Sequence, residues 1–294
     1  MTKNSLTIII INYFAFDELK DCLASIDEQY LEIRIFILDN ATDGKSLEEL
    51  KLVTNHEIHF LYSKENIGFT AGCNRTFNYV VQKFGLPENV LFLNPDIILS
   101  KNQLYELLET MKIHHADLVY PKTILPDGTP YCSGTHFDIR KILVYNHYYK
   151  DARKPLWADF YQGSVFIVKG SVYKSLGGMD DKLFMYFDEV DFSFRIKKAG
   201  FNILYNPMIT IIHNASYSMK NNHYRKAYYI ARNGLYIFHR YTSRRTLKNS
   251  FWFFYYRVFT VLILWYLKNG YIKSILYSLY GYYHAFRGRF GKLA

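Results

Sequence analysis

The sequence predicts an α/β fold, a mostly parallel sheet with helices on both faces, followed by a basic, aromatic and helical C-terminal region. Two observations in the first 121 residues predict the sheet: apolar, β-branched runs alternate with segments of helical periodicity, and the connections are short. This alternation is typical of parallel strands joined by right-handed crossovers. The third observation is that no acidic residue follows Asp191.

The predicted strands are apolar runs with few polar residues, which is typical of strands buried on both faces. They lie at residues 6–13, 33–40, 57–63, 89–94 and 116–121. The predicted helices lie between them, at residues 17–29, 46–54, 70–84 and 101–114. Ligands of such sheets bind beyond the carboxyl ends of the strands, so the residues after each strand are the first candidates for a site.

Residues 122–160 interrupt this alternation with five prolines and glycines, and we expect an excursion over the sheet edge. Regular structure resumes with a strand at 163–169, a Gly177-Gly178 turn, a helix at 188–199 and strands at 201–205 and 208–213. We expect a first domain at 1–222, with halves at 1–121 and 122–222, and a helical region at 223–294.

Charge is distributed unevenly along the chain. The 294 residues carry 36 Lys and Arg against 26 Asp and Glu, but residues 192–294 contain 17 bases and no acid. A stretch of this kind indicates a polyanionic partner. Its many Tyr, Phe and Trp residues fit either nucleic acid or the headgroups of an anionic membrane. The uncharged run at 258–267 is too apolar for an RNA surface, which favours the membrane.

A helix with two unlike sides is predicted near the C-terminus. One side carries Lys273, Tyr277, Tyr280, His284 and Arg287. The other carries Ile272, Leu276, Leu279, Tyr283 and Phe286. This pattern is typical of a helix lying in a membrane interface with its apolar side down; the alternative is an ordinary amphipathic helix that closes the domain. The preceding apolar run, 251–267, is shorter than the ~20 residues that a spanning helix needs.

Cysteine usage and the N-terminus indicate the compartment. Cys22, Cys73 and Cys132 lie far apart and form no CxxC pair, which fits a reducing compartment and excludes a disulfide scaffold. The apolar run at 6–11 is followed by polar residues without a small-residue cleavage site. We therefore expect no signal peptide and a cytoplasmic location.

Polar side chains follow four consecutive predicted strands. They are Asn12, Asp39-Asn40, Asn66 with Gly68, and Asn94-Pro95-Asp96. No GxGxxG follows the first strand and no GxxxxGK[ST] is present, which counts against a dinucleotide or P-loop site. Asp96, held by a proline turn, is suited to bind a divalent cation and through it a diphosphate. The alternative is a turn in which Asp96 caps the next helix.

Two further candidates lie in the second half of the chain. Asp188-Glu189 follows the apolar stretch 183–187, and a carboxylate at a helix start beside apolar surface can act as a base toward a hydroxyl. Asp191 and Arg195, four residues apart, are expected to form a structural ion pair. His213 ends an apolar run, and a lone His there is more often structural than a ligand.

Taken in order, these residues resemble the family 2 glycosyltransferases, and more narrowly the bacterial rhamnosyltransferase-like members that build surface polysaccharides. The resemblance covers about residues 5–240 and includes Gly163, Gly177-Gly178-Met179-Asp180 and Arg232-Asn233. It implies a GT-A fold with a nucleotide-sugar half at 1–121 and an acceptor half at 122–222. The implied reaction moves a sugar, with inversion, from a nucleotide diphosphate donor to a hydroxyl of a saccharide or lipid-linked acceptor.

The resemblance also implies roles for single residues. The nucleotide site would include Asn12, Asp39, Asn66, Gly68 and Asp96. Asp96 and His213 would hold a divalent cation, Mn²⁺ or Mg²⁺. The base would be Glu189 by position, with Asp188 as the alternative, because the family's usual Glu-Asp order is inverted here. The acceptor side would include Trp157, Asp159, Gly163 and Asp191.

Several alternatives remain at this stage. The donor is either dTDP-rhamnose, which the subgroup favours, or a UDP-linked hexose. A catalytically inactive binding or scaffold subunit is favoured only by the inverted Asp188-Glu189 order. A nucleic-acid-binding protein leaves the polar residues after four strands unexplained, and a sugar nucleotidyltransferase needs a Gly-rich triphosphate loop that we do not find near the first strand. We expect an enzyme held peripherally on the inner face of the cell membrane.

Overall fold

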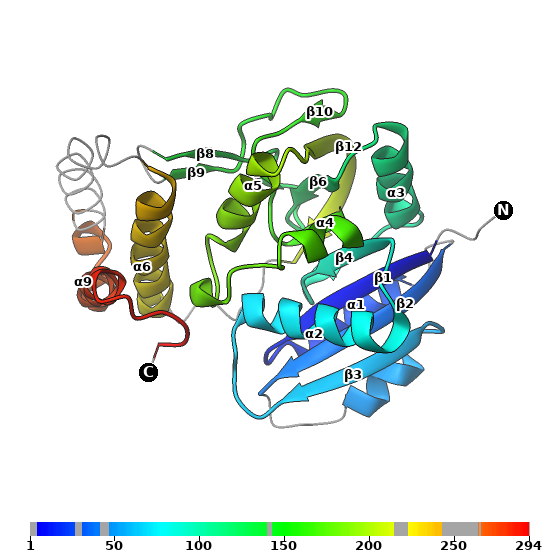
Figure 1. The fold of residues 1–294 in the computed structure, drawn as a ribbon, viewed down its shortest axis with the longest axis horizontal. Helices are drawn as coiled ribbons and strands as arrows, with labels where there is room; N and C mark the ends of the chain where they lie inside the picture. The colour runs from blue at the N-terminus through cyan, green and yellow to red at the C-terminus, as the bar shows by residue number, and fades with distance from the viewer. Residues whose placement is uncertain are drawn as a thin grey trace.

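The computed structural model describes residues 5–26, 31–41, 47–139, 143–214, 223–242, 264 and 266–293. Its main feature is one large sheet in the order β10-β12-β6-β11-β4-β1-β2-β3 (Figure 1). The N-terminal half supplies β1 (Ser5–Asn12), β2 (Glu32–Asn40), β3 (Glu57–Ser63) and β4 (Asn89–Leu93). These four strands are parallel, as the sequence predicts.

The second half of the chain completes the sheet. It supplies β6 (Leu118–Ile124), β10 (Leu156–Trp157), β11 (Val165–Lys169) and β12 (Ile203–His213). The strand β11 is antiparallel to both its neighbours, β4 and β6, whereas β12 is parallel to β6. Two short strands pair outside this order, β5 (Ile97–Ile98) with β12 and β7 (Pro130–Cys132) with β6, both antiparallel. The sheet is therefore mostly parallel with one reversed central strand.

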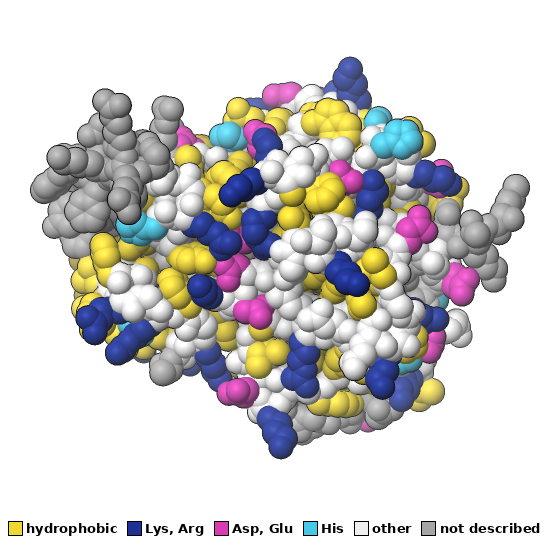
Figure 2. All heavy atoms as spheres, in the orientation of Figure 1, with side chains coloured by type: hydrophobic (Ala, Val, Ile, Leu, Met, Phe, Trp, Pro, Cys, Tyr) yellow, Lys and Arg dark blue, Asp and Glu magenta, His cyan; other side chains and the backbone are white. Residues whose placement is uncertain are grey.

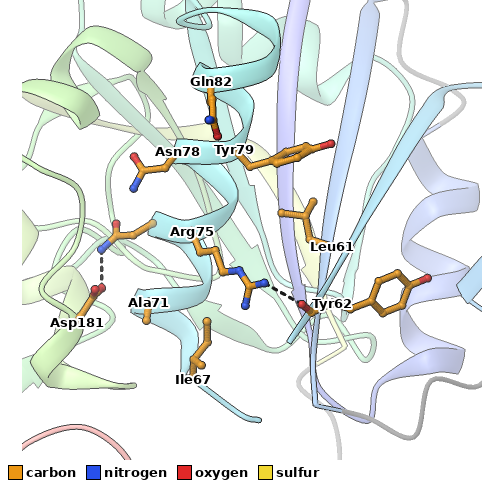
Figure 3. A pocket seen from close by; sticks show the side chains of 10 residues that line it. Leu61, Tyr62, Ile67, Ala71, Arg75, Asn78, Tyr79, Gln82 and Asp181 are labelled. Carbon is orange, nitrogen blue, oxygen red and sulfur yellow. Dashed lines mark hydrogen bonds between the residues drawn. The ribbon is translucent and has the colours of Figure 1, made fainter. Parts of the chain in front are cut away.

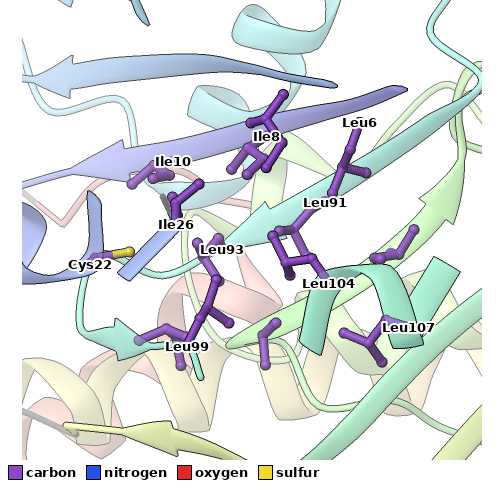
Figure 4. Packing of buried hydrophobic residues seen from close by; sticks show 14 of the residues in the cluster. Leu6, Ile8, Ile10, Cys22, Ile26, Leu91, Leu93, Leu99, Leu104 and Leu107 are labelled. Atoms are coloured by element: carbon purple, nitrogen blue, oxygen red, sulfur yellow. The ribbon is translucent and has the colours of Figure 1, made fainter. Parts of the chain in front are cut away.

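Helices cover both faces because successive strand residues point to opposite sides. On one face Ile8 and Ile10 pack with α1 (Phe16–Ile26) and α3 (Gln103–Ile113) (Figure 4). On the other face Ile9 packs with α2 (Phe69–Phe84), α4 (Gly170–Ser175) and α5 (Asp188–Lys198). Full burial of each Ile or Leu side chain contributes about 1.5–3 kcal/mol. This two-sided burial explains why the strands read as continuous apolar runs.

The structure differs from the predicted elements in three places. Residues 46–54, predicted as a helix, contain only the 3₁₀ segment η1 (Leu47–Leu52). The strands expected at 201–205 and 208–213 form one strand, β12, whose register shifts between Asn206 and Thr210. Pro207 lies there and has no amide hydrogen to donate to the neighbouring strand. The excursion at 122–160 contains β7, β10 and the hairpin β8 (His136–Asp138) and β9 (Leu143–Tyr145).

Two C-terminal helices pack side by side at one end of the molecule (Figure 1). They are α6 (His223–Tyr241) and α9 (Ile272–Phe286), and α9 confirms the predicted C-terminal helix. The predicted apolar run at 251–267 lies mostly outside the described residues. Among the helices that the structure describes, we find no segment long and apolar enough to cross a membrane. Cys22, Cys73 and Cys132 are buried and free, as expected.

Candidate active site

The carboxyl ends of β1, β2 and β3 bring together the polar side chains that follow them. The Asn12 amide Nδ2 donates to Asp39 Oδ1 at 3.2 Å, and both residues are buried. The Asn40 amide donates to Asn66 Oδ1 at 3.1 Å and to the Gly68 carbonyl at 3.2 Å. Buried polar groups must be paired, and here they pair with one another. This edge of the sheet is therefore a preformed polar wall.

The Gly68 turn joins this wall to a segment far along the chain. The Phe69 amide donates to the Phe184 carbonyl at 2.7 Å. Gly68 has φ +88°, and a Cβ added there would lie 2.6 Å from the Phe184 carbonyl oxygen. Only glycine combines this backbone conformation with so close an approach. The turn after β3 and the segment before α5 are thus held in contact.

Asp96 and His213 form a pair at the next strand end. The residues after Asp96 form β5, which pairs with the end of β12 so that His213 lies opposite Ile97. This pairing leaves His213 Nε2 3.2 Å from Asp96 Oδ1. The other ring nitrogen of His213, Nδ1, is buried and has no hydrogen-bond partner in the described parts of the chain. The tertiary fold therefore joins two residues that the sequence predicted as metal ligands.

Residues 182–187, which we name the strap, set the position of the next acids. Phe184, Tyr186 and Phe187 all have left-handed backbone conformations, with φ of 65°, 66° and 65°. Each such residue costs about 1–2 kcal/mol unless glycine fills the position. The surrounding structure must therefore hold the strap in place.

Arg232 and Asn233 of α6 hold the strap in place by hydrogen bonds to its carbonyl groups. The Arg232 guanidinium donates to the Leu183 carbonyl at 2.8 Å and to the Lys182 carbonyl at 3.2 Å. The Asn233 amide donates to the carbonyls of Leu183, Met185 and Tyr186 at 2.8–2.9 Å. Both side chains are fully buried. The strap carbonyls are thus satisfied by α6 rather than by water.

Asp188 and Glu189 begin α5 immediately after the strap. Burial raises the pKa of the Asp188 carboxyl to about 6, and burial together with the nearby Asp188 charge raises the pKa of Glu189 to about 8. The two carboxyl groups also hydrogen-bond to each other. Such a pair titrates as a unit and holds one proton near neutral pH. A desolvated carboxylate of this kind is a strong base toward a hydroxyl.

Tyr131 of β7 lies near both the Asp96-His213 pair and the Asp188-Glu189 pair. Its ring is 4.4 Å from the His213 ring in an edge-on arrangement. Burial raises the pKa of the Tyr131 hydroxyl, and the charges of Asp96 and Glu189 add to this rise. The charges of Asp188 and Glu189 both act on the deeply buried Tyr161 as well. The acid pair and the Asp96-His213 pair are therefore close enough to influence one residue.

Asp191, on the same helix as the acid pair, has both carboxylate oxygens bound to protein groups. It is 0% exposed, and its Oδ2 accepts from Arg195 Nε at 2.7 Å, which confirms the predicted ion pair. Its Oδ1 accepts from the Tyr241 hydroxyl at 2.7 Å and lies 3.2 Å from Arg240 Nη1. Both oxygens therefore bind protein groups, and we assign Asp191 to the support of α5.

The other residues predicted on the acceptor side are dispersed. A Cβ built on Gly163 would lie 3.8 Å from Glu189 Cβ and 3.9 Å from Asp188 Oδ2, so its backbone borders the acid pair. Trp157 is exposed on the edge strand β10. Asp159 is half-exposed and forms an ion pair with Lys197. The structure brings Gly163 to the acids and leaves Trp157 and Asp159 at the surface.

A groove of about 720 Å³ runs along the outer side of α2 (Figure 3). Its charged groups already have partners: Arg75 donates to the Tyr62 carbonyl at 3.0 Å, and Asp181 accepts from Asn74 at 2.6 Å. Neither acid of the Asp188-Glu189 pair lines it. The groove therefore borders the polar wall at Ile67 but does not include the acid pair.

Sequence reasoning missed Tyr131, because it lies in the proline- and glycine-rich stretch that gave no strand signal. It noted Arg232-Asn233 but assigned no role, because a basic residue in a basic helix gives no sign of burial. Nothing in the local pattern marks residues 184, 186 and 187 as left-handed. These features arise from contacts between distant segments.

The fold and this edge define a class of protein, the GT-A glycosyltransferases. Similar solved structures include GalNAc-T7 with UDP, GalNAc and Mn²⁺ (TM-score 0.59, 16% identity, 72% of this chain) and S. aureus TarS 1-349 (TM-score 0.54, 14% identity, 79% of this chain). This chain spans 43% of the length of the first and 65% of the second. At these identities the likeness shows the fold.

The chain belongs to glycosyltransferase family 2. The family model described as "Glycosyl transferase family 2" matches residues 7–177, more than half of the chain. It is thus a glycosyltransferase, as the motif order predicts.

Named relatives include rhamnosyl- and hexosyltransferases. The chain is 27% identical to the low-salt glycan biosynthesis hexosyltransferase Agl10 of Haloferax volcanii, over 72% of this chain and 67% of that protein. It is 24% identical to the N-acetylglucosaminyl-diphospho-decaprenol L-rhamnosyltransferase of Mycobacterium tuberculosis, over 72% and 77%. It is also 24% identical to the rhamnosyltransferase WbbL of Escherichia coli, over 73% and 85%.

Proposed function

We propose that this glycosyltransferase moves a sugar, with inversion, from a nucleotide diphosphate to a hydroxyl of a saccharide or lipid-linked acceptor in bacterial surface polysaccharide synthesis. One observation carries the proposal. The charges of Glu189, in the desolvated Asp188-Glu189 pair, and of Asp96, in the Asp96-His213 pair, both act on the Tyr131 hydroxyl. A base close to an anion-binding centre is what an in-line displacement requires.

In the proposed reaction Glu189 takes the proton from the acceptor hydroxyl. The acceptor oxygen forms a bond to the anomeric carbon as the bond from that carbon to the diphosphate oxygen breaks, on the opposite face of the sugar. The proton ends on the carboxyl pair, and the nucleoside diphosphate leaves with the bonding electrons. Asp188, deeper in the protein, raises the basicity of Glu189 by its charge.

The donor groups at Asp96 and His213 fit a divalent cation, Mn²⁺ or Mg²⁺. A carboxylate and an imidazole are ordinary ligands for Mn²⁺, and one or two protein ligands plus substrate phosphates are usual for such ions. Groups of three His, Cys, Asp or Glu residues suited to a metal do not occur among the described residues, so phosphate oxygens and water would complete the shell. The bound ion would supply positive charge for the leaving diphosphate.

We propose that the nucleotide lies along the wall formed by Asn12, Asp39, Asn66 and Gly68. This wall is continuous with Asp96 along the carboxyl ends of β1 to β4. Carboxyl ends of parallel strands are where such ligands bind. The acceptor would approach past Gly163, where the absence of a side chain leaves the acid pair open, and past Trp157 at the rim.

The donor we propose is dTDP-rhamnose, because two of the named relatives are rhamnosyltransferases. The lipid-linked acceptor is supported by the name of the mycobacterial relative, which acts on a diphospho-decaprenol. A UDP-linked hexose is the second candidate, because the relative with 27% identity is a hexosyltransferase.

We also propose the division into a catalytic domain at 1–222 and a helical region at 223–294, with the protein bound peripherally to the inner membrane face. The 17 bases without an acid after residue 191 support attraction to anionic lipid.

The test of this function is calorimetric titration of the purified protein with dTDP, UDP and GDP, with and without Mn²⁺ or Mg²⁺. We expect one nucleotide to bind in a metal-dependent manner, and Asp96→Ala to lose that dependence. The matched control is Asp21→Ala, an exposed carboxylate on α1, which should bind as the wild type does.

A turnover assay with the sugar nucleotide that binds then separates an enzyme from an inactive subunit. Glu189→Gln should bind nucleotide but lose transfer. Failure of folded wild-type protein to bind any of the nucleotides would overturn the proposal, and metal-dependent binding without transfer to any saccharide or lipid-linked acceptor would favour the inactive subunit.

A further inference from the structure

The helix α9 buries small side chains and exposes large apolar ones, which is the reverse of a helix in an ordinary globular protein. Its buried face carries Ser274, Ser278 and Gly281, and its exposed face carries large apolar side chains. In a water-soluble helix the apolar stripe normally faces the core. The partner of the exposed face therefore lies outside this chain's own core.

Close approach to α6 explains the small residues. A Cβ added to Gly281 would lie 2.4 Å from the carbonyl oxygen of Tyr228 and 3.1 Å from the Arg232 amide nitrogen. The two helix backbones are therefore nearly in contact at this point. Beside these small residues, His284 of α9 is hydrogen-bonded to the Tyr228 hydroxyl at 2.7 Å, and the Tyr277 ring lies against Tyr224 of α6.

The opposite face is exposed along the whole helix. Ile272, Leu276 and Phe286 are 64%, 63% and 62% exposed. Leu279 and Tyr283 extend the same stripe and are also exposed. Contiguous apolar surface of this kind marks an interaction site rather than scattered surface residues. Apolar side chains gather at this end of the molecule, with Lys and Arg beside them (Figure 2).

The charged side chains of α9 and of the described segment after it are all positive. Lys273 lies on α9, Arg287 caps its C-terminal end, and Arg289 and Lys292 follow; all four are exposed. The sequence has no carboxylate after Asp191 to offset them. Aromatic and aliphatic side chains bordered by Lys and Arg are typical of helices that lie in the interface of an anionic bilayer.

We propose that the exposed face of α9 docks on an anionic lipid bilayer, with Ile272, Leu276, Leu279, Tyr283 and Phe286 inserted among the acyl chains and Lys273 and Arg287 against the headgroups. A second copy of this chain is a poorer partner, because face-to-face docking would place like charges together. Nucleic acid is also poorer, because its phosphates contact bases rather than a stripe of aliphatic side chains.

Docking would orient the active site, a consequence that rests on the proposed function. Arg232 of α6 holds the strap before Asp188-Glu189, and its guanidinium also donates to the Gly291 carbonyl, just beyond α9, at 2.5 Å. A docked α9 would therefore hold the acid pair at a set orientation to the bilayer. A lipid-linked acceptor would meet the acids from that side.

The test is sedimentation of the full chain with sucrose-loaded vesicles of phosphatidylcholine, alone or mixed with phosphatidylglycerol. We expect binding to the mixed vesicles that weakens as salt is raised. The double variant Ile272→Glu, Leu276→Glu should lower the partition coefficient about ten-fold or more, because removing each Leu or Ile side chain from water favours binding by at least about ten-fold. Lys273→Glu should lower it about five-fold or more on mixed vesicles, with little effect on phosphatidylcholine alone.

The matched control is Leu52→Glu, which changes an equally apolar side chain that is 90% exposed on η1. It should bind vesicles as the wild type does. Thermal unfolding of each variant checks that the fold is retained, since every altered side chain lies at the surface.

The proposal is overturned if the wild type and the double variant bind mixed vesicles equally. It is also overturned if the wild type does not bind vesicles but forms a dimer that the double substitution disrupts. A complex with an oligonucleotide that depends on Leu276 would likewise overturn it. Nucleotide titration of the same proteins keeps the two proposals apart. If vesicle binding fails while nucleotide binding is normal, docking and the proposed membrane attachment are overturned and the proposed transfer reaction stands. The reverse result overturns only the proposed transfer reaction.

Discussion

At the scale of single residues, the Asp188-Glu189 pair is costly to the fold. Both carboxyls have a raised pKa because burial disfavours their charged forms. The folded state therefore binds more protons than the unfolded state between about pH 4.5 and 8, and stability falls as pH rises through this window. A raised pKa of this kind is also what the base that we propose here requires near neutral pH.

We predict that Glu189→Gln stabilises the protein at pH 8 while abolishing transfer. Removing the carboxylate removes the penalty of holding its charge, which is worth roughly 1–3 kcal/mol. Thermal unfolding at pH 5 and pH 8 measures this, and the gain should be present only at the higher pH. The control is Glu106→Gln, an exposed acid on α3. A gain of the same size in that control would contradict the assignment.

We predict that Asp188→Asn moves the rising limb of the pH–rate profile to lower pH. The charge of Asp188 and its hydrogen bond both raise the pKa of Glu189, and the substitution removes the charge. Burial remains, so the limb should stay above the ordinary Glu value of about 4.3. Initial rates of transfer at saturating donor across pH 5–9 test this. An unchanged limb with full activity would show that Glu189 titrates independently, and complete inactivity would favour Asp188 itself as the base.

Residue type and order were enough to select these acids from the sequence. They were not enough to rank them, because rank depends on the surroundings: the charge of Glu189 acts on Tyr131, and the charge of Asp188 acts on Cys73. Asp191 shows the same limit. Its pairing with Arg195 follows from helical spacing, but its contacts with Tyr241 and Arg240 come from another helix.

At the scale of elements, the candidate site depends on hydrogen bonds between segments that are far apart in the chain. The turn at Gly68 contacts Phe184 of the strap, and the strap is held from its other side by Asn233 of α6. The polar wall and the acid pair are therefore parts of one assembly. Its left-handed residues are retained because several hydrogen bonds hold them at once.

We predict that Gly68→Ala destabilises the fold by about 1–3 kcal/mol more than Gly85→Ala. The two glycines flank the same helix, α2, with φ of 88° and 86°, so the backbone strain is matched. They differ in space: a Cβ at Gly68 would clash with Phe184, whereas Gly85 has no atom within 4 Å of that position. Chemical denaturation of both variants measures the difference. Equal losses would mean that the strap yields without cost.

Periodicity predicted most of these elements because strands and helices are local patterns. It failed at η1 and in residues 122–160. Short strands such as β7 and β10 have too few residues to show alternation, and they exist because a neighbouring strand offers hydrogen bonds.

At the scale of the whole molecule, α6 lies between the active site and α9. On one side of α6, Asn233 donates hydrogen bonds to the strap. Elsewhere on α6, the backbone at Tyr228 packs closely against Gly281 of α9. The basic C-terminal region is therefore joined to the acid-bearing α5 and to the sheet. This arrangement places the proposed lipid-facing surface and the proposed base on one connected unit.

We predict that Gly281→Ala lowers the stability of the protein. Helix propensity alone would raise it by about 1 kcal/mol. The added Cβ would, however, lie 2.4 Å from the backbone oxygen of Tyr228, so the two helices must separate. Packing losses of this kind are about 1–3 kcal/mol. Thermal unfolding tests this through the direction of the change in the midpoint temperature. A lower midpoint supports the close approach of α9 to α6, and a higher midpoint contradicts it.

The sequence by itself determined the parallel α/β architecture, the family, the acids at strand and helix ends and the two-sided pattern of α9. All of these follow from local periodicity and from the order of residues along the chain. Only the tertiary structure decided that Asp96 meets His213, that Tyr131 lies beside His213 and that the small side of α9 is buried. The physical reason is that these contacts depend on strand pairing and helix docking between distant segments, which no local pattern specifies.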